Sequence, residues 1–260
     1  MAPERDTSIR RGLDVLAVLE SPEALTRGGL GVTRIANILG KDKSQISRSL
    51  KVLAEYGLID RDPKTLAYRL GWRIYSMARR SGDHRLLSSA EPVLDELLAR
   101  TGESVYLSVM SNYEALTVLE RVPRHAVQAT SGIWPVFSTS VGRVLLAGRQ
   151  DAEIRRMYEG VPVQTRGPHG IDGVEDLLAR IADVRRDGHA VVSDEFEDGL
   201  TAVGAPVRDH RGDVIAALGV SGPSFRFAAK AEEAVAEVLA AAARIEERFV
   251  TPHAGAEADE

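Results

Sequence analysis

Between Lys43 and Leu53 the chain reads KSQISRSLKVL, a segment with two faces of opposite character. Apolar side chains recur at spacings of three and four, the period of an amphipathic helix; they are Ile46, Leu50 and Leu53. Polar and basic side chains follow the same period on the other side, namely Ser44, Ser47, Arg48 and Lys51. The pattern predicts a helix from Lys43 to Tyr56 that packs one face on a core and leaves a basic face uncovered.

The segments around this helix predict a small domain. A first helical pattern follows candidate N-caps at Thr7 and Ser8, and its apolar residues are Ile9, Leu13, Leu16, Val18 and Leu19. A second helical pattern spans residues 32–39 and ends at Gly40. Residues 58–61, 62–65 and 66–70 then read as strand, turn and strand. Two helices joined by a tight turn and followed by a hairpin form a winged helix-turn-helix, whose second helix enters the major groove of DNA.

The charge distribution separates the two ends of the chain. The net charge is −5 over 260 residues, but residues 1–80 carry 15 Lys or Arg against 9 Asp or Glu, a net charge of +6. The remaining residues carry −11. The first part of the chain is therefore suited to a polyanion, and the second part is not.

The composition excludes several classes of protein. With 44% hydrophobic and 27% charged residues, the chain is neither disordered nor collagen-like. It has no cysteine, which excludes disulfide scaffolds, thiolate metal sites and thiol nucleophiles and favours a reducing compartment. No apolar run approaches the roughly 18 residues of a membrane span, and no signal peptide is recognisable. We expect a cytoplasmic protein without a membrane partner.

The second part of the chain predicts an α+β domain beyond a break at residues 81–83. Helical patterns occur at 86–100, 138–148, 151–159, 173–187 and 228–249. Extended runs occur at 104–110, 116–122, 126–130, 189–192, 201–208 and 214–220, the first three forming an antiparallel meander. Because proline fits only the first turn of a helix or a kink, Pro92 predicts that the first of these helices begins at Glu91.

Several segments, in order, resemble the IclR family of bacterial transcription regulators. The opening helix (SIRRGLDVL, 8–16), the helix at 43–53 and the hairpin segments 56–59 and 68–71 resemble the DNA-binding domain of that family. In the second part, STSVGR (138–143), EFEDGL (195–200), APV (205–207) and AALGVSGP (216–223) resemble its effector-binding domain. The likeness covers nearly all of residues 8–250.

The resemblance implies a domain order and a function. A winged helix-turn-helix domain would occupy residues 1–71, a linker helix 72–84, a GAF-like effector-binding domain 85–250 and a disordered tail 251–260. Such a protein is a sequence-specific regulator, with repression favoured, whose affinity for its operator changes when a small molecule binds. Dimers would pair through the DNA-binding domains, join into tetramers in some members, and read a pseudo-palindromic operator.

The expected DNA contacts fall into two groups. Near the base edges we expect Ser44, Gln45, Ser47 and Arg48, because glutamine pairs with adenine and arginine with guanine. Near the phosphates we expect Lys43, Lys51, Arg61, Lys64 and Arg69. Arg34 either joins the phosphate contacts or is merely solvated.

The resemblance also places an effector cup at Ser140, Val141, Val192, Leu200, Ala202, Gly219 and Ser221. Some members that bind small oxoacids have a carboxylate in place of Val192 and a cysteine in place of Ala202, so the cup of this chain is more apolar. It suits a partly apolar or aromatic metabolite, with Trp134 as a candidate wall. The alternative is that the aliphatic residues are ordinary core.

An enzyme with a helical appendage is the alternative function, and an adaptor that uses the winged helix only to dimerise is a third. The chain shows no nucleophile elbow, no phosphate-binding loop and no zinc helix. The acidic run at 194–198 is a metal site by composition alone, but such runs are usually solvated loops and no histidine stands at ligand spacing. We therefore expect no enzymatic activity, no cofactor and no metal.

Overall fold

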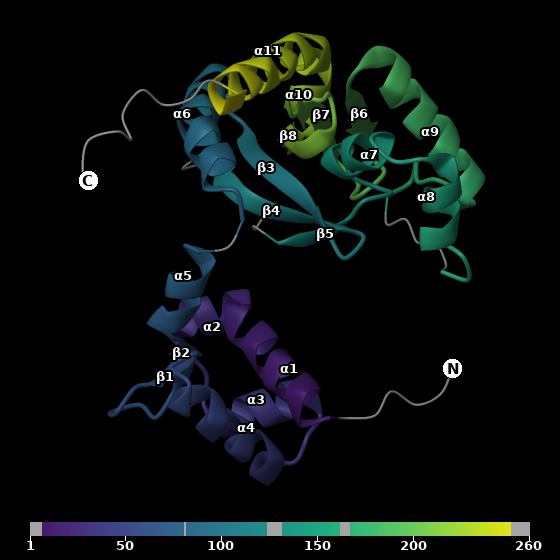
Figure 1. Ribbon diagram of the computed structural model, residues 1–260. Helices are drawn as coiled ribbons and strands as arrows, with labels where there is room; N and C mark the ends of the chain where they lie inside the picture. Colours follow the sequence, from purple (N-terminus) through teal and green to yellow (C-terminus); the bar gives the residue numbers. More distant parts are fainter. Residues whose placement is uncertain (1–6, 81, 124–131, 162–166, 251–260) are drawn as a thin grey trace. The chain divides into compact units, whose positions relative to one another are not determined.

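The structure, a computed structural model, describes residues 7–80, 82–123, 132–161 and 167–250. It divides into two compact units, Met1–His84 and Arg85–Glu260, each with a hydrophobic core of its own (Figure 1). The strand expected at 126–130 and the tail expected at 251–260 lie outside the described residues.

The first unit has the winged helix-turn-helix order that the sequence predicts. Its helices are α1 (Ser8–Glu20), α2 (Pro22–Arg27), α3 (Val32–Leu39), α4 (Lys43–Glu55) and α5 (Trp72–Ala78). Strands β1 (Ile59–Arg61) and β2 (Tyr68–Leu70) pair antiparallel, and Leu30 forms a further bridge to Tyr68. Gly40 ends α3 in the left-handed conformation, with a φ of 60°. The predicted tight turn between α3 and α4 is therefore confirmed.

Helix α1 packs through a narrower stripe than its periodicity predicts. Thr7 caps the helix by accepting the N–H of Arg10, and Val15, Val18 and Leu19 are buried. Ile9 and Leu13, which the pattern placed on the same apolar face, are 75% and 61% exposed. The expectation that they join the core is wrong, because at about 100° per residue Ile9 and Leu13 lie on a different side of α1 from the buried residues.

Helix α2 is an element that the sequence analysis missed. Ser21 accepts the N–H of Ala24 as an N-cap, Pro22 occupies the first turn, and Gly28 ends the helix with a φ of 67°. Each of these residues is a standard boundary signal. The six-residue helix is too short to show a hydrophobic period, so its capping residues are the only sequence signal for it.

The second unit is built on one antiparallel sheet with the strand order β5-β4-β3-β8-β7-β6. These strands are β3 (Ser104–Ser111), β4 (Glu114–Arg121), β5 (Ile133–Pro135), β6 (Ala190–Ser193), β7 (Leu200–Arg208) and β8 (Val214–Pro223). The predicted meander is confirmed for β3 and β4, and its third described strand is β5. Strands β3 and β8 join the two halves of the sheet.

Helices cover both faces of this sheet (Figure 1). On one face, α6 (His84–Thr101) and α11 (Ala231–Val250) pack on Val105, Val203 and Leu218. On the other, α7 (Ser140–Ala147) and α9 (Gly173–Asp187) pack around Ala115 and Ala217, with α8 (Asp151–Met157) beside them. Between β8 and α11 lie α10 (Ser224–Phe227) and a 3-10 turn, Ala228–Lys230. The α+β class is confirmed.

Helix α6 continues through Pro92 and does not begin at Glu91. Proline removes the hydrogen bond to the carbonyl four residues earlier, which is that of Ser88. Ser88 is exposed, so water can satisfy its carbonyl. Buried residues anchor the helix on both sides of the proline: Leu86, Ser89 and Ala90 before it and Val93, Leu94 and Leu97 after it. Packing therefore outweighs the local preference of proline.

The described helices include none that is both long and apolar enough to cross a membrane.

Candidate DNA-binding surface and effector cup

The predicted recognition helix, α4, shows the two faces that its sequence requires. Ile46 and Leu50 are fully buried and Leu53 nearly so, and they pack α4 against α1 and α3. Of the residues expected at DNA, Lys43, Ser44, Ser47, Arg48 and Lys51 are exposed, while Gln45 is half-buried. The apolar face thus fixes the helix, and the polar face is open to a partner.

Intramolecular contacts leave this polar face available. The Nε of Arg48 donates to the carbonyl of Ser44 over 3.4 Å, a long hydrogen bond within one turn. The ammonium group of Lys51 lies 3.9 Å from a carboxylate oxygen of Glu55, and both side chains are largely exposed. Exposed pairs of this kind contribute little and exchange readily for other partners.

The hairpin holds three further basic residues on a rigid turn. A carboxylate oxygen of Asp62 accepts the N–H groups of Thr65 and Lys64 over 2.7 and 2.8 Å. These two bonds are the main reason that the pKa of Asp62 lies below its ordinary value of 3.8. The guanidinium of Arg61 stacks on the ring of Tyr68 at 5.4 Å, and Lys64 and Arg69 are exposed. The hairpin that follows α4 in the sequence is therefore ordered and carries a basic surface.

Arg34 is not merely solvated, because it is paired with an acidic residue of α2. Its guanidinium makes two hydrogen bonds to the carboxylate of Glu23, at 3.0 and 2.8 Å, which tie α3 to α2. The pair lowers the pKa of Glu23 and raises that of Arg34. Because α2 was not predicted, its acidic residue was not seen as a partner.

Five of the seven residues of the expected cup are on the face of the sheet that α7 covers, and the other two, Ser140 and Val141, are in α7 itself. In β7 and β8, Val203, Ala205, Leu218 and Val220 belong to the core under α6 and α11. Alternation along the strands turns Leu200, Ala202, Gly219 and Ser221 to the opposite face. Val192, Ala202 and Ser221 lie abreast in the register of β6, β7 and β8. Val192 and Ala202 are buried, yet neither belongs to the two cores of this unit.

The first turn of α7 brings Ser140 and Val141 onto this row. Thr139 caps the helix by accepting the N–H of Gly142 over 3.2 Å. The hydroxyl of Ser140 is fully buried and has no hydrogen-bond partner among the described residues. A Cβ added at Gly204 would lie 3.0 Å from the backbone of Ser140. The glycine is therefore what allows α7 to approach β7 so closely.

Tyr106 of β3 lies at the centre of these residues, although the sequence analysis did not single it out. It pairs with Gly219 in the register of β3 and β8. A Cβ added at Gly219 would lie 2.5 Å from the ring of Tyr106 and 2.7 Å from Val141. Gly219 thus provides space for the tyrosine ring and does not itself line the cup with a side chain. The signal was present as an aromatic residue within an alternating strand, but its partner depends on strand pairing.

Burial raises the pKa of the Tyr106 hydroxyl, and hydrogen bonding with Ser221 opposes that rise. The neighbouring hydroxyl of Ser140 also opposes the rise, although it makes no hydrogen bond of ordinary geometry. The phenol is consequently neutral at physiological pH and remains a hydrogen-bond donor.

The acidic run at 194–198 is not simply a solvated loop. The carboxylate of Glu195 is buried and bonded to both terminal nitrogens of Arg143 in α7, whose Nε donates to the carbonyl of Phe137 over 3.2 Å. The next residue, Phe196, meets Trp134 edge to face with ring centroids 5.5 Å apart. The described residues contain no group of three His, Cys, Asp or Glu side chains placed to hold a metal ion.

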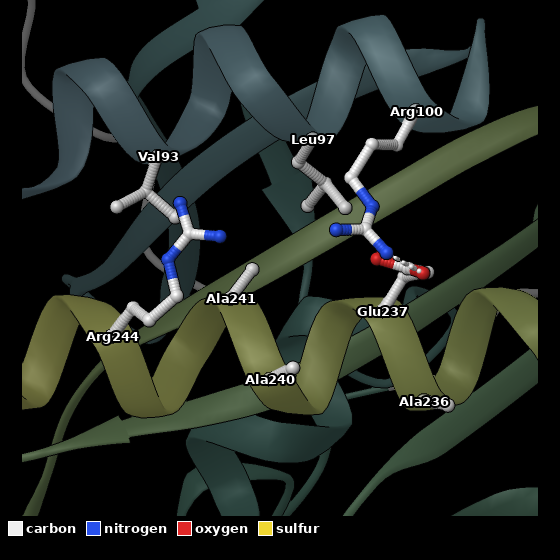
Figure 2. A pocket seen from close by; sticks show the side chains of 8 residues that line it. All are labelled: Val93, Leu97, Arg100, Ala236, Glu237, Ala240, Ala241 and Arg244. Atoms are coloured by element: carbon white, nitrogen blue, oxygen red, sulfur yellow. Dashed lines mark hydrogen bonds and ion pairs between the residues drawn. The ribbon is translucent and has the colours of Figure 1, made fainter.

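A separate groove of about 130 Å³ lies on the opposite face of the sheet, between α6 and α11 (Figure 2). Val93, Leu97 and Ala241 form its apolar floor. Arg100 and Arg244 project over it, each ion-paired, with Glu237 and Glu96 respectively. This groove shares no residue with the expected cup.

Each of the two units matches a domain of known proteins. Residues 8–63 match the IclR helix-turn-helix domain, and residues 81–247 match the domain described as bacterial transcriptional regulator IclR C-terminal. The HTH-type transcriptional regulator XynR of Escherichia coli (strain K12) is 32% identical over 218 residues, covering 82% of this chain and 85% of that protein. The regulator KdgR of the same organism is 27% identical over 219 residues, covering 83% of each.

A solved structure shows the same architecture. An IclR homolog complexed with 4-hydroxybenzoate, from Microbacterium hydrocarbonoxydans, matches 94% of this chain and 99% of its own with a TM-score of 0.78 and 25% identity. The helix-turn-helix match, the C-terminal match over more than half of the chain and the relative at 32% identity lead to one conclusion. The chain belongs to the IclR family of bacterial transcriptional regulators.

Proposed function

We propose that this regulator binds operator DNA through α4 and the β1–β2 hairpin, acts as a repressor, and changes its affinity for the operator when a small molecule occupies the cup. The observation that carries the proposal is the exposed polar face of α4, held outward by the burial of Ile46 and Leu50. In the helix-turn-helix mode such a face reads base edges in the major groove. The protein is a regulator and not an enzyme, and it acts in the cytoplasm, where bacterial DNA is.

The base contacts in this proposal come from Ser44, Gln45, Ser47 and Arg48, and the phosphate contacts from Lys43, Lys51, Arg61, Lys64 and Arg69. Arg48 suits a guanine, with about 1–3 kcal/mol of discrimination for a good bidentate pair. Gln45, half-buried in the first turn of α4, offers less surface to a base than its exposed neighbours do.

The proposed operator is pseudo-palindromic because the protein acts as a homodimer, or as a tetramer of two such dimers. Support comes from apolar residues that the first unit leaves uncovered: Ile9 and Leu13 on α1 and Trp72, Tyr75 and Met77 on α5. Helix α5, the proposed linker, has no buried residue in the described structure. Large exposed apolar side chains of this kind mark protein interfaces.

The proposed effector is a partly apolar acid, bound among Ser140, Val141, Val192, Leu200, Ala202, Gly219 and Ser221. The cup offers hydroxyl donors to the polar group of such a ligand and aliphatic walls to its apolar part. The related structure is complexed with 4-hydroxybenzoate, which supports an aromatic acid as the class of ligand. A ligand changes DNA affinity only by binding one conformation better than another.

The test is a binding selection of the purified protein against random duplex DNA at two salt concentrations. Enrichment of an inverted repeat that weakens as salt rises supports the proposal, because phosphate contacts are salt-dependent. Without enrichment, and with DNA retention no better than that of residues 81–260 alone, the proposal fails and the second unit should be screened for enzymatic activity.

A further inference from the structure

Tyr106 stands where the expected cup residues converge. Its ring lies against Val141 and the backbone of Gly219, and its hydroxyl lies among the hydroxyls of Ser140 and Ser221. Four of the seven expected cup residues therefore surround one side chain that was not among them. The close approach of the ring is possible only because residue 219 has no Cβ.

Part of the Tyr106 surface is open, although the residue lies in a central strand. Strand β3 is flanked by β4 and β8, and α7 covers this face of the sheet. Ser108, two residues further on the same face, is fully buried, whereas Tyr106 is only half-buried. Tyr106 therefore keeps surface that a ligand bound among these residues can contact.

The chemistry of this position is that of a neutral donor. The phenol is protonated, and the buried hydroxyl of Ser140 beside it has no hydrogen-bond partner among the described residues. A buried hydroxyl without a partner costs free energy that a bound acceptor would recover. Val141, Val192 and Ala202 supply apolar surface beside these donors.

We propose that Tyr106 is a specificity-determining residue of the effector cup: its hydroxyl donates a hydrogen bond to an oxygen of a monocarboxylate whose remainder is an apolar ring. The proposal rests on the function proposed above and adds to it the residue that selects the ligand. Tyr106 acts by direct contact, and Gly219 and Val141 position its ring.

The test is isothermal titration calorimetry of the full-length protein with 4-hydroxybenzoate and with benzoate. Tyr106→Phe removes the hydroxyl and keeps the ring; Tyr113→Phe, at an exposed position in the turn between β3 and β4, removes a hydroxyl far from the cup. We expect at least a tenfold rise in Kd for Y106F and less than a twofold change for Y113F. Thermal unfolding of both variants checks that the fold is intact.

The two ligands distinguish which oxygen is recognised. If the Tyr106 hydroxyl meets the carboxylate, Y106F weakens both ligands; if it meets the ring hydroxyl, only 4-hydroxybenzoate is weakened, and either result supports the contact. Equal affinities in Y106F and the natural protein overturn the proposal. Failure of the natural protein to bind either compound also overturns it, by refuting the ligand class. In that case, operator selection with the same preparation still decides the proposed function independently.

Discussion

Replacing Glu195 by glutamine should destabilise the effector-binding unit far more than the same change in an exposed ion pair. Glutamine keeps the size of the side chain but removes the charge that neutralises Arg143. The side chains of Arg143 and Glu195 are only 3% and 7% exposed. Water therefore cannot solvate the guanidinium that would be left without a counter-charge.

The magnitude follows from this burial. Breaking a buried ion pair by removing one partner costs about 3–5 kcal/mol. For a unit of this size, 1 kcal/mol corresponds to a shift of roughly 2–4 °C in the midpoint of thermal unfolding. We expect Glu195→Gln to lower the midpoint of the second unit by about 6–20 °C. The double variant Arg143→Met, Glu195→Leu should recover more than half of that loss, because it leaves no buried charge.

The fluorescence of Trp134 provides a local assay. The chain has two tryptophans, and Trp134 contacts Phe196, next to Glu195. Replacing Trp72 by phenylalanine in every variant leaves Trp134 as the sole reporter.

Glu175→Gln is the matched control, since Glu175 accepts two hydrogen bonds from Arg155 at 2.8 and 2.9 Å while both side chains remain exposed. The control should unfold at the midpoint of the natural protein. Equal midpoints for E195Q and E175Q, or a double variant no more stable than E195Q, would refute the reasoning.

Three further predictions concern the first unit. Arg48→Ala should remove the preference for one base pair in each half-site and change the free energy of unfolding by less than about 0.5 kcal/mol, since Arg48 is exposed; an unchanged operator in binding selection would contradict this assignment. Asp62→Ala should weaken retention on immobilised operator DNA severalfold, whereas Asp62→Asn, which keeps an acceptor oxygen, should lose less. Because the pKa of Asp62 is lowered in the folded protein, its stabilising effect is complete above pH 3.8 and is lost as the pH falls through the lowered pKa. If the hairpin amides keep the same protection against hydrogen exchange throughout that range, this prediction is wrong. Leu13→Glu should shift the protein toward monomer in sedimentation velocity and weaken operator binding, while Val52→Glu, at an exposed site on α4, should leave the oligomer unchanged; a dimer that persists in L13E would place the interface elsewhere.

The sequence predicts elements well where the local signals and the packing agree. In α4 the apolar period, the uncovered basic face and the glycine after Tyr56 all point to one helix, and the structure has it at Lys43–Glu55. The predictions were wrong where a local sequence signal and the tertiary packing favour different structures. Pro92 argues locally for a helix start, yet buried residues on both sides of it hold α6 continuous.

Periodicity also cannot show what covers a face. At about 100° per residue, Ile9 and Leu13 lie on a different side of α1 from Val18 and Leu19, and the core of the first unit covers only the side of the latter pair. The pattern was correct about the helix and silent about whether the apolar side chains meet their own chain or another. For the same reason Arg34 looked free until α2 placed Glu23 beside it.

The cup illustrates a different limit, because its geometry arises from strands far apart in the sequence. Gly219 and Tyr106 are separated by more than a hundred residues. Only the pairing of β3 with β8 shows that the tyrosine ring occupies the space that a Cβ at residue 219 would fill. A substitution at residue 219 would therefore reach the ligand through Tyr106 and Val141. Family resemblance can name position 219, but it cannot say which side chain fills the space.

Helix α7 links this cup to the buried ion pair. Its first turn carries Ser140 and Val141 of the proposed cup, and one residue beyond Gly142 the same helix is fixed to Glu195 through Arg143. A ligand that moves α7 by even a fraction of a hydrogen-bond length must therefore carry residues 194–196 along or break a buried pair. Because such a pair is expensive to break, α7 and that segment should move as one body. If effector binding leaves the fluorescence spectrum of Trp134 unchanged, this coupling is wrong, since the Trp134 ring contacts that of Phe196.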